Sequence, residues 1–254
     1  MTSPVAQPPI PAATLILFRD RAGAPPELLF VERSPAMRFA GGAIVFPGGR
    51  IDAADYALAR LQTDDDAAMV ERAARIAAIR ETAEEAGVAV GLTGEGDLSR
   101  LRRDLAGGMA TGAALHDAGY ALATDRLTPF ARWCPDFPHA RVFDTRFYLA
   151  RAPDDMAMPE VDGTENVRVF WASAADILDQ ADRDEVRLIF PTRRTLERLA
   201  GYACFADALA DAAEWPIRKI TPWVERRDGV DMLCIPDDLG YPITASPADA
   251  AFRA

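Results

Sequence analysis

The stretch Arg80–Val88 reads RETAEEAGV, and the interpretation of the whole chain depends on it. Its three carboxylates, Glu81, Glu84 and Glu85, are spaced i, i+3 and i+4, so on a helix they lie on one face within about one turn. Like charges at this spacing repel each other by some tenths of a kcal/mol. A divalent cation with oxygen ligands relieves that repulsion. The pattern therefore indicates a metal site, and the alternative is a solvated acidic helix end.

The residues around the three glutamates fit the same helix. Arg80 lies four residues before Glu84 and can hold one carboxylate in a fixed orientation. Gly87 supplies a left-handed cap that ends the helix. The periodicity predicts a helix over about residues 67–86 with a buried apolar stripe. That stripe consists of Ile76, Ile79, Ala83 and Ala86. The carboxylates fall on a different face, where a ligand can reach them.

The composition limits the class of protein. The chain has 254 residues, half of them hydrophobic, which is enough for one large domain with its own core. A net charge of −11 argues against nucleic acid or an anionic membrane as a partner. It does not argue against a small phosphorylated substrate held by metals and local arginines. Three scattered cysteines and the lack of a signal peptide or long apolar run predict a cytoplasmic location.

A glycine- and proline-rich segment, residues 33–49, precedes the acidic helix and reads RSPAMRFAGGAIVFPGG. Arg33 and Arg38 can each bind a phosphate group through two hydrogen bonds. The paired glycines in this segment allow close backbone approach and positive φ angles. Taken alone, the segment would be an ordinary surface loop with two solvated arginines.

The remaining pattern predicts an α/β chain. Strands are expected at residues 12–18, 27–32, 127–133, 141–151 and 167–171, the first two forming a hairpin. Further helices are expected at residues 56–62, 98–106, 113–123 and 172–180, and a C-terminal helical part is expected at residues 185–189 and 192–213, broken at Pro191. We expect a single domain over residues 1–254. Its parts are a core over about 12–180, a helical insert over about 92–124 and a C-terminal extension over about 181–254, of which residues 215–254 are predicted to be irregular.

RETAEEAGV, preceded by the glycines of FPGG, resembles the Nudix box. In that family a glycine, five residues, a glutamate and seven residues lead into REUXEEXGU, where U is aliphatic. Here Gly49 and five residues lead to Asp55 in place of the first glutamate. Residues 56–79, 24 in number, then separate Asp55 from Arg80, so we interpret the box as split by an insertion. The resemblance implies a Nudix-type α/β/α sandwich with a mixed sheet.

A lengthened box and the upstream segment are similar to the coenzyme A diphosphatase branch of that family. Its second signature is approximately R, S or A, three residues, R, three residues, G, three residues and FPGG. This chain matches it from Arg33 to Gly49. The resemblance implies that the arginines bind substrate phosphates, including the 3′-phosphate of coenzyme A. The substrate-binding residues it implies are Arg33, Arg38, Gly42, Phe46, Gly48 and Gly49.

The resemblance also implies catalytic roles. Mg²⁺ or Mn²⁺ would be held by Glu81, Glu84 and Glu85, and Arg80 would orient a glutamate. The general base would be Glu81 or, from outside the box, Glu165, with Glu160 as a second external candidate. The reaction would be hydrolysis of a diphosphate linkage in coenzyme A or acyl-CoA. Its products would be 3′,5′-ADP and 4′-phosphopantetheine or its acyl form.

Two other functions fit the same residues. One is a house-cleaning Nudix pyrophosphatase that acts on other nucleoside diphosphate derivatives. The other is a Nudix-fold module that binds a ligand without turnover, against which the intact set of three glutamates argues. In each case the expected partner is a small nucleotide diphosphate, and no nucleic acid or membrane is expected. A homodimer is compatible with the family.

Overall fold

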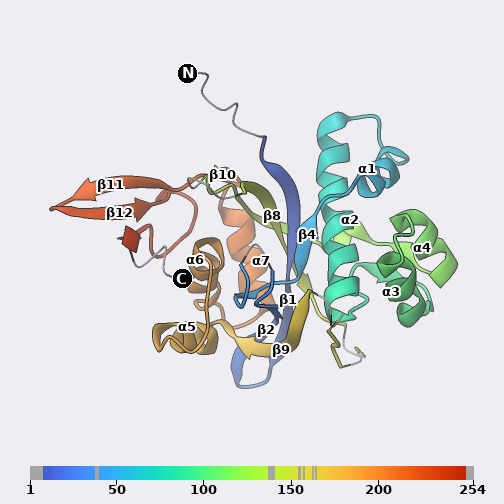
Figure 1. Cartoon of the computed structure of the whole chain (residues 1–254), viewed down its shortest axis with the longest axis horizontal. Coiled ribbons are helices and arrows are strands. Elements are labelled where there is room, and N and C mark those ends of the chain that lie inside the picture. Colours follow the sequence, from blue (N-terminus) through green and yellow to red (C-terminus); the bar gives the residue numbers. More distant parts are fainter. Residues whose placement is uncertain are drawn as a thin grey trace.

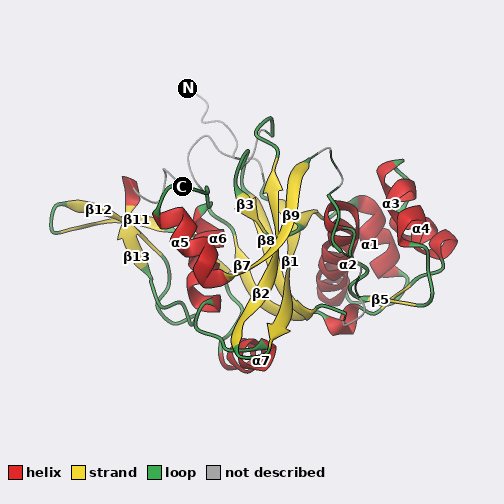
Figure 2. Ribbon diagram, turned by 90° about the horizontal axis from the view of Figure 1, so that it is seen from below, coloured by secondary structure: helices red, strands yellow, loops and turns green. Residues whose placement is uncertain are grey.

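A central sheet between two helical layers makes up the described part of the chain (Figures 1 and 2). The computed structural model describes residues 8–37, 40–136, 141–153, 156, 158–161, 163 and 165–249. In Figure 2 helices α1 to α4 lie on one side of the sheet and α5 and α6 on the other. The predicted α/β/α sandwich with a mixed sheet is confirmed.

The large sheet is built around β1, which has three neighbours. The strand order is β10-β7-β8-β1-β2-β3, with β4 also pairing with β1 and β9 with β2. β1 runs parallel to β8 and antiparallel to β2 and β4, so the predicted hairpin of the first two strands is confirmed. The strands of this sheet are β1 (Ile10–Arg21), β2 (Ala24–Arg33), β3 (Ile44–Val45), β4 (Gly48–Arg50), β7 (Thr128–Trp133), β8 (Phe143–Arg151), β9 (Asn166–Ser173) and β10 (Lys219–Ile220).

The helices fall largely where the periodicity predicts them. They are α1 (Ala53–Arg60), α2 (Asp66–Ala86), α3 (Leu98–Ala106), α4 (Thr111–Ala118), α5 (Ala174–Asp182), α6 (Phe190–Leu199) and α7 (Phe205–Glu214), with a 3₁₀ turn at Thr124–Arg126. The predicted helix over 113–123 was too long, because Gly119 adopts a left-handed conformation and stops α4. Beyond it, β6 (Ala121–Leu122) pairs with β5 (Leu92–Thr93). The C-terminal helical part consists of α6 and α7. The prediction of helix over 185–189 was wrong, and Pro191 lies in the first turn of α6 and does not break a helix.

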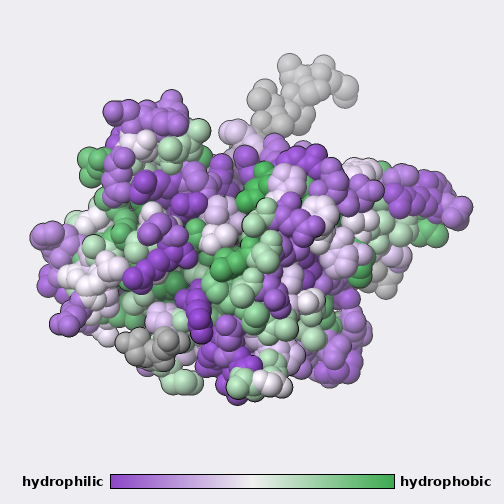
Figure 3. Space-filling model, turned by 180° about the vertical axis from the view of Figure 1, so that it is seen from behind, coloured by the Kyte–Doolittle hydropathy of each residue, from purple (hydrophilic) through white to green (hydrophobic). Residues whose placement is uncertain are grey.

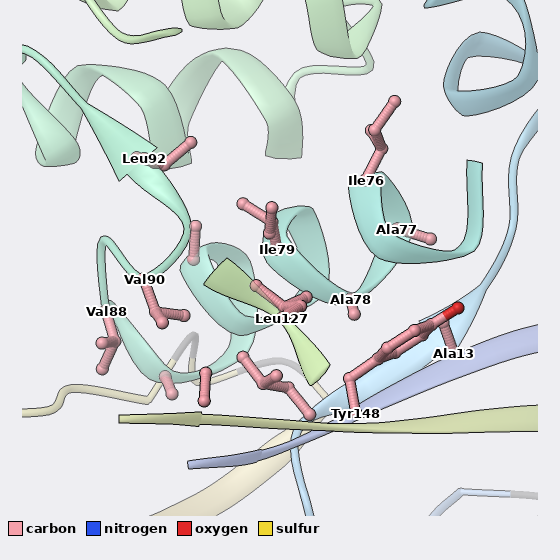
Figure 4. Packing of buried hydrophobic residues seen from close by; sticks show 14 of the residues in the cluster. Ala13, Ile76, Ala77, Ala78, Ile79, Val88, Val90, Leu92, Leu127 and Tyr148 are labelled. Carbon is pink, nitrogen blue, oxygen red and sulfur yellow. The ribbon is translucent and has the colours of Figure 1, made fainter. Parts of the chain in front are cut away.

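Helix α2 begins and ends as the sequence predicts. The Asp65 carboxylate caps its first turn by accepting from the Ala67 N–H at 2.8 Å, and Gly87 ends the helix with φ 64°. Its apolar residues Ile76 and Ile79 are fully buried. Figure 4 shows them among Val90, Leu92 and Leu127, with Tyr148 and Ala13 from the sheet beside the helix.

The carboxylates of α2 are not a solvated helix end, because Glu81 and Glu84 are partly buried and Glu85 is buried. Helices α1 and α3 pack against α2. Glu85 is enclosed on the side of β4 and β9, where it accepts from the Gly48 N–H and from Asn166 Nδ2. No helix of the described residues could span a membrane, since α2, the longest, carries charged residues along its length.

The other face of the sheet is covered by α5, α6, α7 and the C-terminal part of the chain. The prediction of an irregular segment over residues 215–254 was wrong for much of its described part. β10 extends the main sheet, and a separate small sheet is formed by β11 (Trp223–Arg227), β12 (Val230–Cys234) and β13 (Ala245–Pro247). The β11–β12 hairpin projects from the molecule in Figure 1. Seen from behind, the surface is hydrophilic at its edges, with hydrophobic residues nearer the centre (Figure 3).

We predict that Ile79→Ala lowers the free energy of unfolding by about 2–5 kcal/mol, because it leaves a cavity under α2. Leu61→Ala is the control, since Leu61 is 81% exposed, and it should change stability by less than about 0.5 kcal/mol. Urea denaturation followed by circular dichroism measures both. Equal effects of the two changes would contradict the packing described for α2.

Candidate active site

A cavity of about 1160 Å³ contains the glutamates of α2. One wall comes from the C-terminal half of α2 and from α3, and another from the aromatic residues of β7, β8 and the first turn of α6. The floor is the short strand β4 with β1 beside it. The cavity therefore reaches from one helical layer to the other, past the edge of β4.

Arg80 is the centre of the hydrogen-bond network in this cavity. Its Nη1 donates to Glu81 Oε1 and Glu84 Oε2, both at 2.9 Å. Its Nη2 donates to the Arg50 carbonyl oxygen at 2.9 Å, and Nε and Nη2 bind the two oxygens of Asp55 at 3.2 and 2.9 Å. Arg80 is only 8% exposed. The predicted orienting role of Arg80 thus has a geometric basis, because one guanidinium holds three carboxylates.

Asp55 is fully buried although it comes from a different helix. Its Oδ1 also accepts from the Thr111 hydroxyl at 2.9 Å, and its Oδ2 accepts from the Asp52 N–H at 3.0 Å. Thr111 is the first residue of α4. A residue of the helical insert therefore fixes the carboxylate that fixes Arg80.

The two glycines of FPGG lie in β4 against the glutamates. The Gly48 N–H donates to Glu85 Oε2 at 2.9 Å. A Cβ on Gly49 would lie 2.3 Å from Glu81 Oε1, so only glycine allows this approach without displacing the carboxylate. The other oxygen of Glu85 accepts from Asn166 Nδ2 at 3.0 Å. Part of the predicted loop over residues 33–49 is therefore strand, and its backbone contacts the acidic helix directly.

Burial raises the pKa of all three glutamates. Loss of solvation is the largest cause, and it raises the pKa of Glu81 to about 8 and that of Glu85 to about 7. The pKa of Glu84 is raised in the same direction for the same reason. Burial also opposes the charge of Arg80, yet its pKa is raised because Glu81, Asp55 and Glu84 surround it. The positive charge of nearby protein groups is thus not enough to keep the pKa values of these glutamates at their usual level.

The chemistry of these donors fits a hard divalent cation. Three carboxylates within about one turn of one helix line one cavity, and a nearby cation would lower their raised pKa values. Within the part of the chain that the structure describes, no three acidic, histidine or cysteine side chains already converge as a metal cluster. The reason is that Glu81 and Glu84 turn toward Arg80, and Glu85 turns toward Gly48 and Asn166.

Most of the residues predicted to bind substrate line this cavity. They are Arg33, Phe46, Gly48 and Gly49. Arg33 lies 3.8 Å from Glu85 and 3.6 Å from Glu165, measured from its Nη atoms to the carboxylate oxygens. Gly42 is not among the lining residues; its φ of 74° shapes the turn, and its N–H donates to the Arg33 carbonyl. Arg38 lies outside the described residues.

The two external base candidates differ in position. Glu165 lines the cavity beside Arg33, and its side chain is 57% exposed. Glu160 is 81% exposed and is not among the lining residues, and its carbonyl oxygen accepts from Arg102 Nη2 at 2.9 Å. The geometry therefore favours Glu165 over Glu160 as the external candidate.

Sequence reasoning missed several residues of the site. Asn166 and Thr111 each hold one carboxylate, and no local motif marks either of them. The first turn of α6 also lines the cavity, through Phe190 and its neighbours, although the C-terminal part was not expected to reach the site. Only the position of Asn166 next to the predicted base Glu165 could have drawn attention to it.

Comparison with known proteins gives structural matches. No protein-family model matches the chain, and neither does any curated protein sequence. The crystal structure of a Nudix hydrolase from Alicyclobacillus acidocaldarius is 29% identical, with a TM-score of 0.71, and the match covers 81% of this chain and 97% of that one. The Nudix domain of Shewanella oneidensis NrtR, complexed with ADP-ribose, is 16% identical with a TM-score of 0.43, covering 76% and 86% of the two chains. The TM-score of the second match is too low for that structure to support any conclusion about this chain.

The fold, the buried carboxylates of α2 and this likeness define the class of the protein. It is an enzyme similar to the Nudix hydrolases, which hydrolyse acid anhydrides. Enzymes of this class generally use divalent metals, in agreement with the donor set of α2.

We predict that Gly49→Ala and Gly48→Ala affect the enzyme differently. The new Cβ at Gly49 meets the end of the Glu81 side chain, so the carboxylate moves and kcat falls at least about tenfold while the fold persists. At Gly48 the Cβ would lie 2.5 Å from the Ala13 carbonyl oxygen, so the strand itself must shift and the melting temperature falls. Activity assays and thermal melts of both variants test this, and a Gly49→Ala enzyme with full activity would contradict it.

We predict that the metal-free protein loses stability relative to Glu81→Gln as the pH rises from about 5 to 8.5. A carboxyl group whose pKa is raised on folding stabilises the fold in its neutral form, and that contribution disappears as the pH passes the folded pKa of about 8. One pKa unit corresponds to about 1.4 kcal/mol, so the difference in melting temperature should reach several degrees.

Thermal melts at a series of pH values in chelator measure this difference. Glu95→Gln, an exposed position outside the cavity, should parallel the wild type. Parallel curves for wild type and Glu81→Gln would show that Glu81 titrates normally.

Proposed function

We propose that this enzyme hydrolyses the diphosphate linkage of a nucleotide derivative with a divalent metal, and that its substrate is coenzyme A or acyl-CoA. The products are then 3′,5′-ADP and 4′-phosphopantetheine or its acyl form. The observation that supports this most is the convergence of Glu81, Glu84 and Glu85 on one cavity, against the glycines of β4.

The interpretation of a split Nudix box is supported by the contact between Asp55 and Arg80. If Asp55 takes the place of the first glutamate of the box, the two ends of the inserted segment should lie together, so that Asp55 and Arg80 are close in the structure. Residues 56–79 complete α1 and form most of α2, and both oxygens of Asp55 bind the Arg80 guanidinium. The alternative is a structural ion pair that happens to lie near the box.

The size and lining of the cavity support a large substrate with both apolar and anionic parts. Its volume of about 1160 Å³ is somewhat larger than that of most ligand pockets, which reach about 1,000 Å³. Its aromatic wall suits an adenine ring or a pantetheine arm, and its arginines suit phosphates. The aromatic members of that wall are Trp133, Phe143, Phe147 and Phe190.

In the proposed mechanism, Glu81, Glu84 and Glu85 would hold Mg²⁺ or Mn²⁺, which would supply positive charge to the diphosphate and lower the pKa of an attacking water. Arg80 keeps two of these carboxylates in position through its hydrogen bonds. The Gly48 N–H and Asn166 orient Glu85. Arg33, which lies beside Glu85, is placed to bind an oxygen of the diphosphate.

The base that takes the proton of the water is Glu81 or Glu165. Glu81 has a raised pKa, which suits a proton acceptor near neutral pH, and Glu165 is the acid at the open side of the cavity. Glu165→Gln should lower kcat by about 10²-fold or more if Glu165 is the base, and it should have little effect if Glu81 is the base.

A cytoplasmic location, the single-domain division and a homodimer remain predictions from the sequence.

We predict that Glu84→Gln and Glu85→Gln each lower kcat by about 10²-fold or more, since each removes a charged metal ligand. Glu95→Gln is the matched control outside the cavity and should keep full activity. The assay is product analysis with Mg²⁺ and with Mn²⁺ on coenzyme A, acetyl-CoA, a dinucleoside polyphosphate and oxidised nucleotides.

The same panel separates the alternatives. Turnover of oxidised nucleotides or dinucleoside polyphosphates in preference to coenzyme A would favour a house-cleaning pyrophosphatase. Binding of these compounds without any turnover would identify a ligand-binding module. Near-full activity of both glutamine variants would refute the metal site.

A further inference from the structure

Most arginines that the structure describes are held by a carboxylate or another hydrogen-bond acceptor, as expected of a protein with a net charge of −11. Among the described residues, the guanidinium groups without an ion pair or hydrogen bond are those of Arg50, Arg103, Arg126, Arg141 and Arg187. Three of these five, Arg50, Arg103 and Arg141, line the cavity that contains the glutamates, and the other two lie outside it.

The three arginines come from three different parts of the fold. Arg50 is the last residue of β4, and its backbone carbonyl binds Arg80 while its side chain is exposed. Arg141 precedes β8, which runs beside β1. Arg103 lies on α3, in the helical insert. Three arginines of the cavity lining, each from a different element or loop, thus have no ion pair among the described residues.

Helix α3 turns one face toward the cavity, through Ser99, Arg102, Arg103 and Ala106. The two arginines of this face have different tasks. Arg102 donates to the carbonyl oxygens of Glu84 and Glu160, so it ties α3 to the end of α2. Arg103 has no such contact among the described residues, and its side chain is exposed. Its position on this face gives it no evident structural role.

Unpaired like charges around one cavity disfavour each other, and a bound anion relieves this repulsion. The diphosphate of the substrate does not need them, because the proposed metal site and Arg33 already neutralise it. The additional arginines therefore match a second anionic group, separate from the diphosphate. A phosphomonoester fits best, since it carries nearly two negative charges and accepts bidentate hydrogen bonds from guanidinium groups.

We propose that Arg103, together with Arg50 and Arg141, binds a phosphomonoester that the substrate carries apart from its diphosphate. The helical insert then determines specificity by selecting nucleotides phosphorylated at such a second position. This inference rests on the proposed function and deepens it. It assigns the distant phosphate of coenzyme A to these arginines and leaves Arg33 to the diphosphate.

The test compares ligands that differ only in this phosphate. Calorimetry measures binding of 3′,5′-ADP and of 5′-AMP to the wild type and to Arg103→Gln, Arg50→Gln and Arg141→Gln. The wild type should bind 3′,5′-ADP at least about tenfold more tightly than 5′-AMP. Arg103→Gln should remove most of that preference, and the other two variants part of it. Arg126→Gln is the matched control, because Arg126 is also exposed and unpaired among the described residues but lies outside the cavity.

Kinetics supply the second readout. For Arg103→Gln, kcat/KM should fall about tenfold or more on coenzyme A and change less than about twofold on dephospho-coenzyme A. The proposal is overturned if the wild type binds the two ligands equally, or if Arg103→Gln and Arg126→Gln behave alike. Neither 3′,5′-ADP nor 5′-AMP contains a diphosphate linkage, so their binding can be measured whether or not the protein is a diphosphatase. If neither coenzyme A nor dephospho-coenzyme A is hydrolysed, the proposed function is refuted, and the binding comparison still tests the phosphomonoester site.

Discussion

The guanidinium of Arg80 is the group on which the site depends. It joins two carboxylates of its own helix to Asp55 of α1 and to the carbonyl of Arg50 at the end of β4. Helix α2, helix α1 and the strand that forms the cavity floor are therefore held in one arrangement by a single planar cation. A buried charge of this kind is stable only while its partners remain, and removing one partner of such a pair typically costs about 3–5 kcal/mol.

The same arrangement leaves negative charge in excess. Arg80 is shared among three carboxylates, Glu85 has only hydrogen-bond donors and the more distant Arg33, and all three glutamates of α2 have raised pKa values. Carboxylates whose pKa values are raised in this way are common at functional sites. The glycines of β4 contribute by the absence of a side chain, since any Cβ at Gly49 would occupy the space of Glu81.

Helices α3, α4 and α6 all contribute to the site. Helix α3 packs against α2 and carries Arg103, and Thr111 of α4 donates a hydrogen bond to Asp55. The C-terminal part brings the first turn of α6 to the opposite wall and adds β10 to the sheet. Helices α3 and α4 and the C-terminal part therefore contribute side chains to the site. Changes in these side chains would alter substrate specificity without changing the carboxylate-bearing helix.

The sequence by itself determined what depends on neighbours along the chain. Spacing placed the three glutamates on one helix, Gly87 placed the C-terminal end of that helix, and two strand-like segments placed the hairpin of β1 and β2. The tertiary structure alone decided that Asn166 meets Glu85, 81 residues away, and that α3 and α6 close one cavity. It also decided how far each carboxylate is buried, since Glu85 is buried and Glu81 and Glu84 are partly exposed. Local periodicity carries no information on such contacts, because they depend on which surfaces the whole chain packs together.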